Sequence, residues 1–121
     1  MSEAPSTNQR YDLEARTLKF AKDVIKLCKS VKQTPINRDL ISQVVRASTS
    51  VGANYREAND ALSKRDFGHR IRIARREAKE AYFWLQLFEE ASPDADGQAA
   101  PALQEAMELK NILSAIAQKV A

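Results

Sequence analysis

The chain has 121 residues, of which 44% are hydrophobic and 29% are charged, and its formal net charge is +3. These values are ordinary for one soluble globular domain, and the single cysteine excludes an internal disulfide. The sequence has no run of about 18 apolar residues that could span a membrane and no secretory signal at its start, so we expect a cytoplasmic protein without membrane contact.

Residues 1–9 are polar and aperiodic, and we expect them to form a disordered N-terminal tail. Four segments then follow in which apolar residues recur three and four positions apart. They lie at about residues 11–32, 37–61, 64–91 and 100–120. This spacing is typical of a helix with one buried side, so the sequence predicts four amphipathic helices.

The connections between these segments carry turn and capping signals. Thr34-Pro35 separates the first helix from the second, and Asn37 is expected to cap the second helix with its side chain. Ser63, followed three residues later by Asp66, predicts a capping box for the third helix.

Residues 92–97, Ser-Pro-Asp-Ala-Asp-Gly, predict a loop, and Pro101 suits the first turn of the fourth helix. Short connections make successive helices antiparallel neighbours. The sequence therefore predicts an all-α fold in which residues 10–121 form an up-down-up-down antiparallel four-helix bundle.

Apolar residues also extend onto a flank of three of the helices. These flank residues are Leu18, Ala21, Ile25, Cys28, Ile73, Trp84, Leu87, Leu103, Met107 and Ile112. A small bundle cannot cover two stripes per helix in one core, which favours a homo-oligomer. The alternative is a monomer with a broad core face. Cys28 is expected to be a buried, reduced thiol.

The middle of the second helix combines small residues with polar ones. Gly52 within a helix costs about 1 kcal/mol relative to alanine, so we expect a neighbouring helix to come very close there. Asn54, beside Tyr55 at the edge of the stripe, is expected to bond to another helix. Packing or structural roles are assigned to Gly52, Asn54, Tyr55, Glu57 and Glu80.

Basic residues form stripes on two helices. The first stripe contains Lys19, Lys22, Lys26 and Lys29, and the second contains Arg65, His69, Arg72, Arg76 and Lys79. Charges at this spacing can follow a phosphate backbone, with an affinity that depends on salt more than on base sequence. The alternative is a solvated helix face. Aromatic residues that could stack on bases do not alternate with either stripe.

Few residues are suited to catalysis or metal binding. One histidine and one cysteine exclude zinc sites built from several such ligands, and no histidine follows Glu77 or Glu80 as in di-iron bundles. Helix-surface ion pairs explain these two glutamates, which lie among Arg72, Arg75, Arg76 and Lys79. We predict a protein that is not an enzyme and has no metal or cofactor. The alternative is an enzyme that uses His69 with Glu77 or Glu80.

Two motifs carry a family resemblance. Residues 50–58 read Ser-Val-Gly-Ala-Asn-Tyr-Arg-Glu-Ala, and Phe67-x-His69-x-Ile71-x-Ile73-Ala74 precedes Glu80. From about Tyr11 to Val120 the chain resembles bacterial four-helix bundle proteins first met as products of intervening sequences in large-subunit ribosomal RNA genes. Asn54 and Glu57 match the family's asparagine and glutamate. Arg76-Glu77 replaces a Gly-Ser pair of its third helix.

The resemblance implies a homo-oligomer, specifically a pentameric ring. It also implies a fold shared with the accessory variability determinant of diversity-generating retroelements, a basic helical barrel that binds nucleic acid and assists a reverse transcriptase. The family itself has no established biochemical activity.

Together these observations favour a non-enzymatic oligomeric scaffold that binds RNA or DNA non-specifically through basic helix faces. The alternative is a protein–protein adaptor, for example an accessory subunit of a reverse transcriptase that does not contact nucleic acid. Light scattering separates the two hypotheses, because a stable monomer favours the adaptor.

Overall fold

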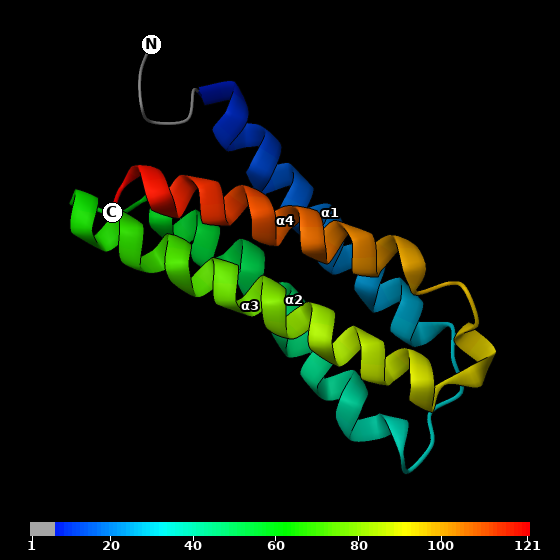
Figure 1. Cartoon of the computed structure of the whole chain (residues 1–121). Helices are drawn as coiled ribbons and strands as arrows, with labels where there is room; N and C mark the ends of the chain where they lie inside the picture. The colour runs from blue at the N-terminus through cyan, green and yellow to red at the C-terminus, as the bar shows by residue number, and fades with distance from the viewer. Residues whose placement is uncertain (1–6) are drawn as a thin grey trace.

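The computed structural model describes residues 7–121, and the side chains from residue 12 onward. It contains the helices α1 (Thr7–Lys29), α2 (Asn37–Asn59), α3 (Lys64–Ala91) and α4 (Ala100–Lys119), and a short 3-10 helix, η1 (Pro93–Ala95). Successive helices run in alternating directions along a common axis (Figure 1), and no strand occurs between residues 7 and 121. The predicted all-α, up-down-up-down four-helix bundle is confirmed.

The first helix begins earlier than the sequence pattern indicates. The predicted tail covered residues 1–9, but α1 already includes Thr7. The remainder of that predicted tail, residues 1–6, lies outside the described residues. Polar residues at the start of a helix leave no apolar stripe to read, which explains the difference in this boundary.

The four helices do not contact one another equally. α3 packs along α2 and α4, whereas α1 packs on α2 and touches α4 only over a narrow region. There Arg16 of α1 binds α4: its Nε lies 2.6 Å from Glu105 Oε2 and its Nη2 lies 2.8 Å from Glu108 Oε1. The bond to Glu105 holds the pKa of Arg16 above its usual range. α1 and α3 consequently lie across the bundle from each other.

The predicted apolar stripes form the core. Its largest fully buried side chains include Tyr55, Phe88, Ile71, Leu85, Leu109 and Leu113. Alanines fill much of the remaining interior, and Ala47, Ala74, Ala78, Ala81 and Ala106 are all completely buried. Such small side chains allow α2, α3 and α4 to pack closely along their length.

Gly52 lies where α1 comes very close to α2. A Cβ atom at this position would lie 2.8 Å from Thr17 Oγ1 and 3.1 Å from Thr17 Cβ. Thr17 is buried, and its hydroxyl donates a hydrogen bond to the Leu13 carbonyl at 2.7 Å. The neighbouring helix that the sequence leads us to expect beside Gly52 is therefore α1.

Asn37 does not cap α2, and the prediction that it does is wrong. Ile36 occupies the N-cap position without a side-chain hydrogen bond, and Asn37 is fully buried. Its Oδ1 accepts from the Thr34 N–H at 2.7 Å, while its Nδ2 donates to the Lys32 carbonyl at 3.0 Å and to Ser92 Oγ at 3.1 Å. The amide thus ties the α1–α2 connection to the end of α3.

The sequence signals at Ser63, at residues 92–97 and at Pro101 agree with the structure. Ser63 caps α3, because its hydroxyl accepts the Asp66 N–H at 3.0 Å. The loop at residues 92–97 contains η1 and ends at Gly97, whose φ of 75° favours glycine. Pro101 lies in the first turn of α4.

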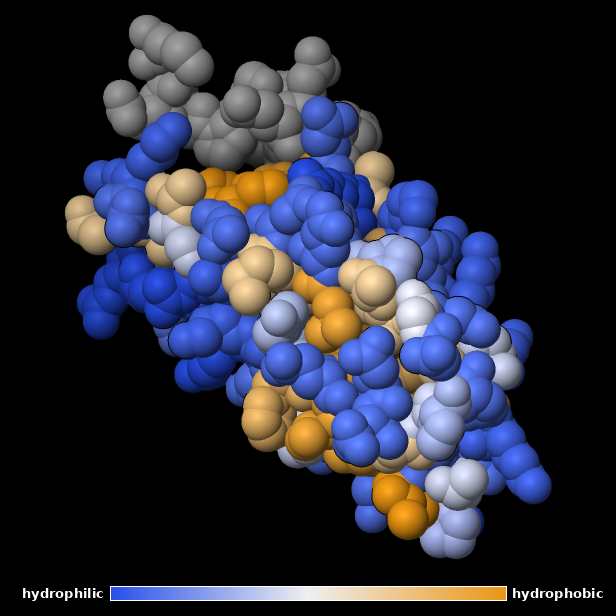
Figure 2. Space-filling view, turned by 45° about the vertical axis from the view of Figure 1, so that its right-hand side comes forward, coloured by the Kyte–Doolittle hydropathy of each residue, from blue (hydrophilic) through white to orange (hydrophobic). Residues whose placement is uncertain are grey.

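The apolar flanks divide into buried and exposed parts. Cys28 is buried, and burial raises the pKa of its thiol to about 11. Leu18 and Ile25 of α1 and Leu87 of α3 are exposed. In the face shown in Figure 2, a broken line of apolar side chains runs between polar ones along the molecule. From residue 7 onward, no helix has the length and apolar character to cross a membrane.

Candidate nucleic-acid interface

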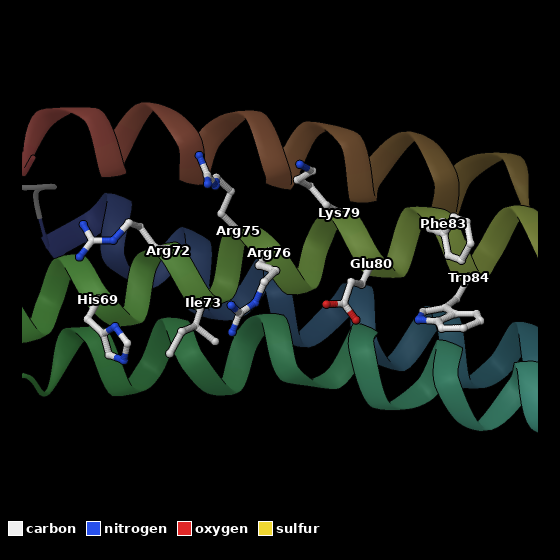
Figure 3. A pocket seen from close by; sticks show the side chains of 9 residues that line it. All are labelled: His69, Arg72, Ile73, Arg75, Arg76, Lys79, Glu80, Phe83 and Trp84. Carbon is white, nitrogen blue, oxygen red and sulfur yellow. The ribbon is translucent and has the colours of Figure 1, made fainter.

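The outer side of α3 presents a row of exposed side chains. His69, Arg72, Arg76 and Phe83 are separated by three, four and seven positions, so they project from the same side of the helix. The core residues of α3 occupy the opposite side. Figure 3 shows the basic side chains toward one end of this row and the aromatic ones at the other.

This row lines a shallow hollow of about 780 Å³. Its lining consists of His69, Arg72, Ile73, Arg75, Arg76, Lys79, Glu80, Phe83 and Trp84. Four cations face one carboxylate, so the lining carries a net charge of +3 when His69 is neutral. The basic surface continues onto the α3–α4 seam, where a smaller hollow of about 200 Å³ shares Lys79 and adds Lys110.

The carboxylates of α3 are paired with a different helix. Arg46 of α2 places Nη1 3.4 Å from Glu77 Oε1 and Nη2 3.1 Å from Glu80 Oε1. Ion pairs do account for these glutamates, but the prediction that their partners are basic residues of α3 is wrong, because Arg46 belongs to α2. Within residues 12–121, Arg72, Arg76 and Lys79 therefore have no carboxylate within 4.0 Å.

Two aromatic residues complete the hollow. Phe83 is 52% exposed, and its ring packs edge-on against Trp84 with centroids 5.1 Å apart and an interplanar angle of 72°. Phe83 lies seven residues after Arg76 and thus on the same helix side, although it does not alternate with the basic residues in the sequence. The predicted basic stripe does not include Arg75, whose Nε is buried without a hydrogen-bond partner in the described part of the chain.

The lysine stripe of α1 belongs to another part of the surface. Lys19, Lys22, Lys26 and Lys29 are all exposed, and Lys19 is paired with Asp23 one turn away. Because α1 lies across the bundle from α3, the fold does not bring the two stripes together. Arg65, in the first turn of α3, is exposed but outside the hollow.

The residues assigned to packing occupy different environments. Asn54 bonds mainly within its own helix, where its Nδ2 donates to the Ser50 carbonyl at 2.9 Å, and its Oδ1 also accepts from Arg70 Nη1 of α3 at 3.3 Å. Tyr55 is completely buried in the core. Glu57, in contrast, is exposed. Of these residues, Asn54 makes the expected bond to a neighbouring helix, through Arg70 of α3.

His69 and Glu80 are poorly placed to act on one substrate atom. They are eleven residues apart on one helix, which corresponds to about 16 Å along its axis. Glu80 is engaged with Arg46, and Glu77, whose side chain is only 14% exposed, is held by the same arginine. Within residues 12–121, no three histidine, cysteine or acidic side chains form a group that could hold a metal ion.

These features define a small all-α antiparallel bundle whose third helix exposes a basic face. A family model described as 23S rRNA-intervening sequence protein matches residues 10–115. The chain belongs to this family, in agreement with the resemblance carried by residues 50–58 and 67–80.

A solved structure supports the same assignment. The chain is 27% identical to a protein with unknown function from the S23 ribosomal protein family of Bacteroides thetaiotaomicron VPI-5482. The match covers 90% of this chain and 97% of that one, with a TM-score of 0.77. A search of curated proteins gave no match.

Proposed function

We propose that the chain is a non-enzymatic scaffold that binds RNA or DNA, with little sequence preference, through the outer face of α3. One observation carries this proposal: Arg72, Arg76 and Lys79 line one hollow and have no carboxylate partners among residues 12–121. Three unpaired cations on one side of a helix attract an anion with repeated charges, and a nucleic-acid backbone has that chemistry.

The composition of the hollow favours phosphate over a carboxylate surface. Arginine presents a planar fork of donors that matches phosphate oxygens, and arginines outnumber lysines in the lining. These contacts position a backbone without reading its bases. The four lysines of α1 lie too far around the bundle to contact a strand that follows α3, so they make at most a separate and weaker site.

Assembly of several copies forms the second part of the proposal. Leu18 and Ile25 lie seven residues apart on α1 and are 43% and 39% exposed. Two large aliphatic side chains on one side of a helix favour contact with another apolar surface. A second copy of the chain, in a ring of five by family resemblance, is the partner we propose. A different protein at this face would make the chain an adaptor.

Charge removal on α3 tests the nucleic-acid proposal. We expect Arg72→Gln/Arg76→Gln/Lys79→Gln to weaken binding of a labelled single-stranded RNA and to reduce the slope of log K against log salt by about 2, since each lost phosphate contact removes about 0.7. Fluorescence anisotropy between 50 and 200 mM salt measures both quantities.

A matched variant on α1 provides the control. Lys22→Gln/Lys26→Gln/Lys29→Gln removes the same charge from exposed positions across the bundle, and we expect it to change the salt slope by less than about 0.5. Equal losses from the two triple variants would show that net charge, and not the α3 face, governs binding. No binding by the unaltered protein at low salt would refute the proposal.

A further inference from the structure

We infer that the α3 hollow takes a short single-stranded segment, with one base stacked on Phe83 and the adjoining phosphates along Arg72, Arg76 and Lys79. This inference rests on the proposed function and deepens it, because it assigns the form of nucleic acid. Phosphate contacts alone do not distinguish a single strand from a duplex. Phe83 favours a single strand, because only an unpaired base has a face free to stack on its ring.

Phe83 has the position that a stacking platform requires. More than half of its surface is exposed, although it lies within a well-formed helix that offers buried positions. Its ring makes an edge-on contact with Trp84, which favours one orientation of the ring. Figure 3 shows both rings at the end of the hollow beyond Arg76 and Glu80. An exposed aromatic ring beside cations combines the two elements of sequence-tolerant single-strand binding.

The length of the row agrees with a short strand. Arg72 and Phe83 are eleven residues apart, which corresponds to about 16 Å along α3. A strand with stacked bases advances about 3.4 Å per nucleotide, so the row spans about five nucleotides. One nucleotide is thus too short to reach from the arginines to the ring, and a decamer covers the whole hollow.

A duplex fits the same face poorly. The major groove of B-form DNA is about 12 Å wide and admits one helix, and the major groove of an A-form RNA duplex is narrower still, but α3 packs along its length between α2 and α4. Helix axes in such bundles are about 8–10 Å apart, so the neighbouring helices would meet the phosphates before α3 entered the groove. In a duplex, moreover, the base faces are covered by their neighbours and cannot stack on Phe83.

Three probes test the inference: a labelled ten-nucleotide oligouridine, a ten-base-pair RNA duplex and inorganic polyphosphate. We expect Phe83→Ala to weaken oligouridine binding about fivefold or more, as for loss of one stacked base, and to change polyphosphate binding less than twofold. Phe83→Tyr retains the ring and should bind as the unaltered protein does. Leu87→Ala, one turn further along α3 and outside the hollow, is the matched control.

Trp84 offers an independent readout, since it is the only tryptophan in the chain. Oligouridine should quench its emission, whereas polyphosphate should not, because only a base brings a π-system to the aromatic pair. Circular dichroism and the melting temperature verify that Phe83→Ala is folded.

The outcomes separate this inference from the proposed function. Suppose that the Arg72→Gln/Arg76→Gln/Lys79→Gln variant loses oligouridine binding while Phe83→Ala retains it. The proposed function would then stand, and the stacking inference would be overturned. Equal affinity for the duplex and the oligouridine would also overturn the inference. If neither variant changes binding, both are overturned.

Discussion

Gly52→Leu is expected to lower the free energy of unfolding by about 3 kcal/mol, at the upper end of typical overpacking costs. Even a Cβ atom at this position would lie 2.8 Å from Thr17 Oγ1, which is shorter than any ordinary contact. The Thr17 side chain cannot simply rotate away, because it is buried and bonded to the Leu13 carbonyl. The melting temperature should therefore fall by roughly 10 °C.

Substitutions by alanine provide the control for this prediction. Gly52→Ala should fail to gain the roughly 1 kcal/mol that alanine contributes in a helix, because the contact with Thr17 opposes it. Gly68→Ala should gain part of that amount. Its new Cβ would meet only the ends of the Arg72 and Val120 side chains, at 3.2 and 3.3 Å. A Gly52→Leu protein that melts like the unaltered one would mean that α1 does not approach α2 closely there.

Asn37→Ala is expected to cost about 2–3 kcal/mol of stability. The substitution removes three hydrogen bonds, to Thr34, Lys32 and Ser92, from a fully buried side chain. Ser92 is also buried, so its hydroxyl would lose the amide donor without gaining water. Denaturant unfolding measures the loss, and hydrogen exchange should show faster opening of the α1–α2 connection.

A second asparagine in α2 serves as the matched control. Asn59 donates to Glu14 Oε2 at 2.8 Å in a half-buried position, where water can replace the lost partner. Asn59→Ala should therefore cost less than about 1 kcal/mol. Ser92→Ala in the Asn37→Ala background should then be better tolerated than Ser92→Ala alone. Equal costs for the two asparagine variants would contradict the role assigned to Asn37.

The positions of the four helices could be predicted from the sequence, because the signals that define a helix are local. Apolar spacing marks the buried side of each helix, and Ser63 caps α3 through the Asp66 N–H only three residues away. Asn37 has the same capping chemistry, yet its amide reaches Ser92, which is distant in sequence and near only in the folded chain. Local patterns cannot distinguish a cap from a buried connector, since both use the same side chain.

Some residues of the candidate site could be predicted from spacing along one helix, whereas others depend on how the helices pack. The spacing of Arg72, Arg76 and Lys79 places them on adjoining parts of one helix side, and Phe83 could have been added by the same rule. The pairing of Arg46 with Glu77 and Glu80 depends on how α2 packs against α3, so it could not be read from one helix. For the same reason, the sequence could not show that the α1 lysines lie across the bundle.

Photo-crosslinking tests the central claim most directly, because it locates a bound strand without altering the protein. A ten-nucleotide oligouridine containing 4-thiouridine would be irradiated with the unaltered protein, and the modified peptides would be identified by mass spectrometry. We expect the crosslinks to fall within residues 69–84 of α3, chiefly at Phe83 and Trp84. Crosslinks concentrated on Lys19–Lys29 of α1, or their absence at saturating protein, would contradict the account.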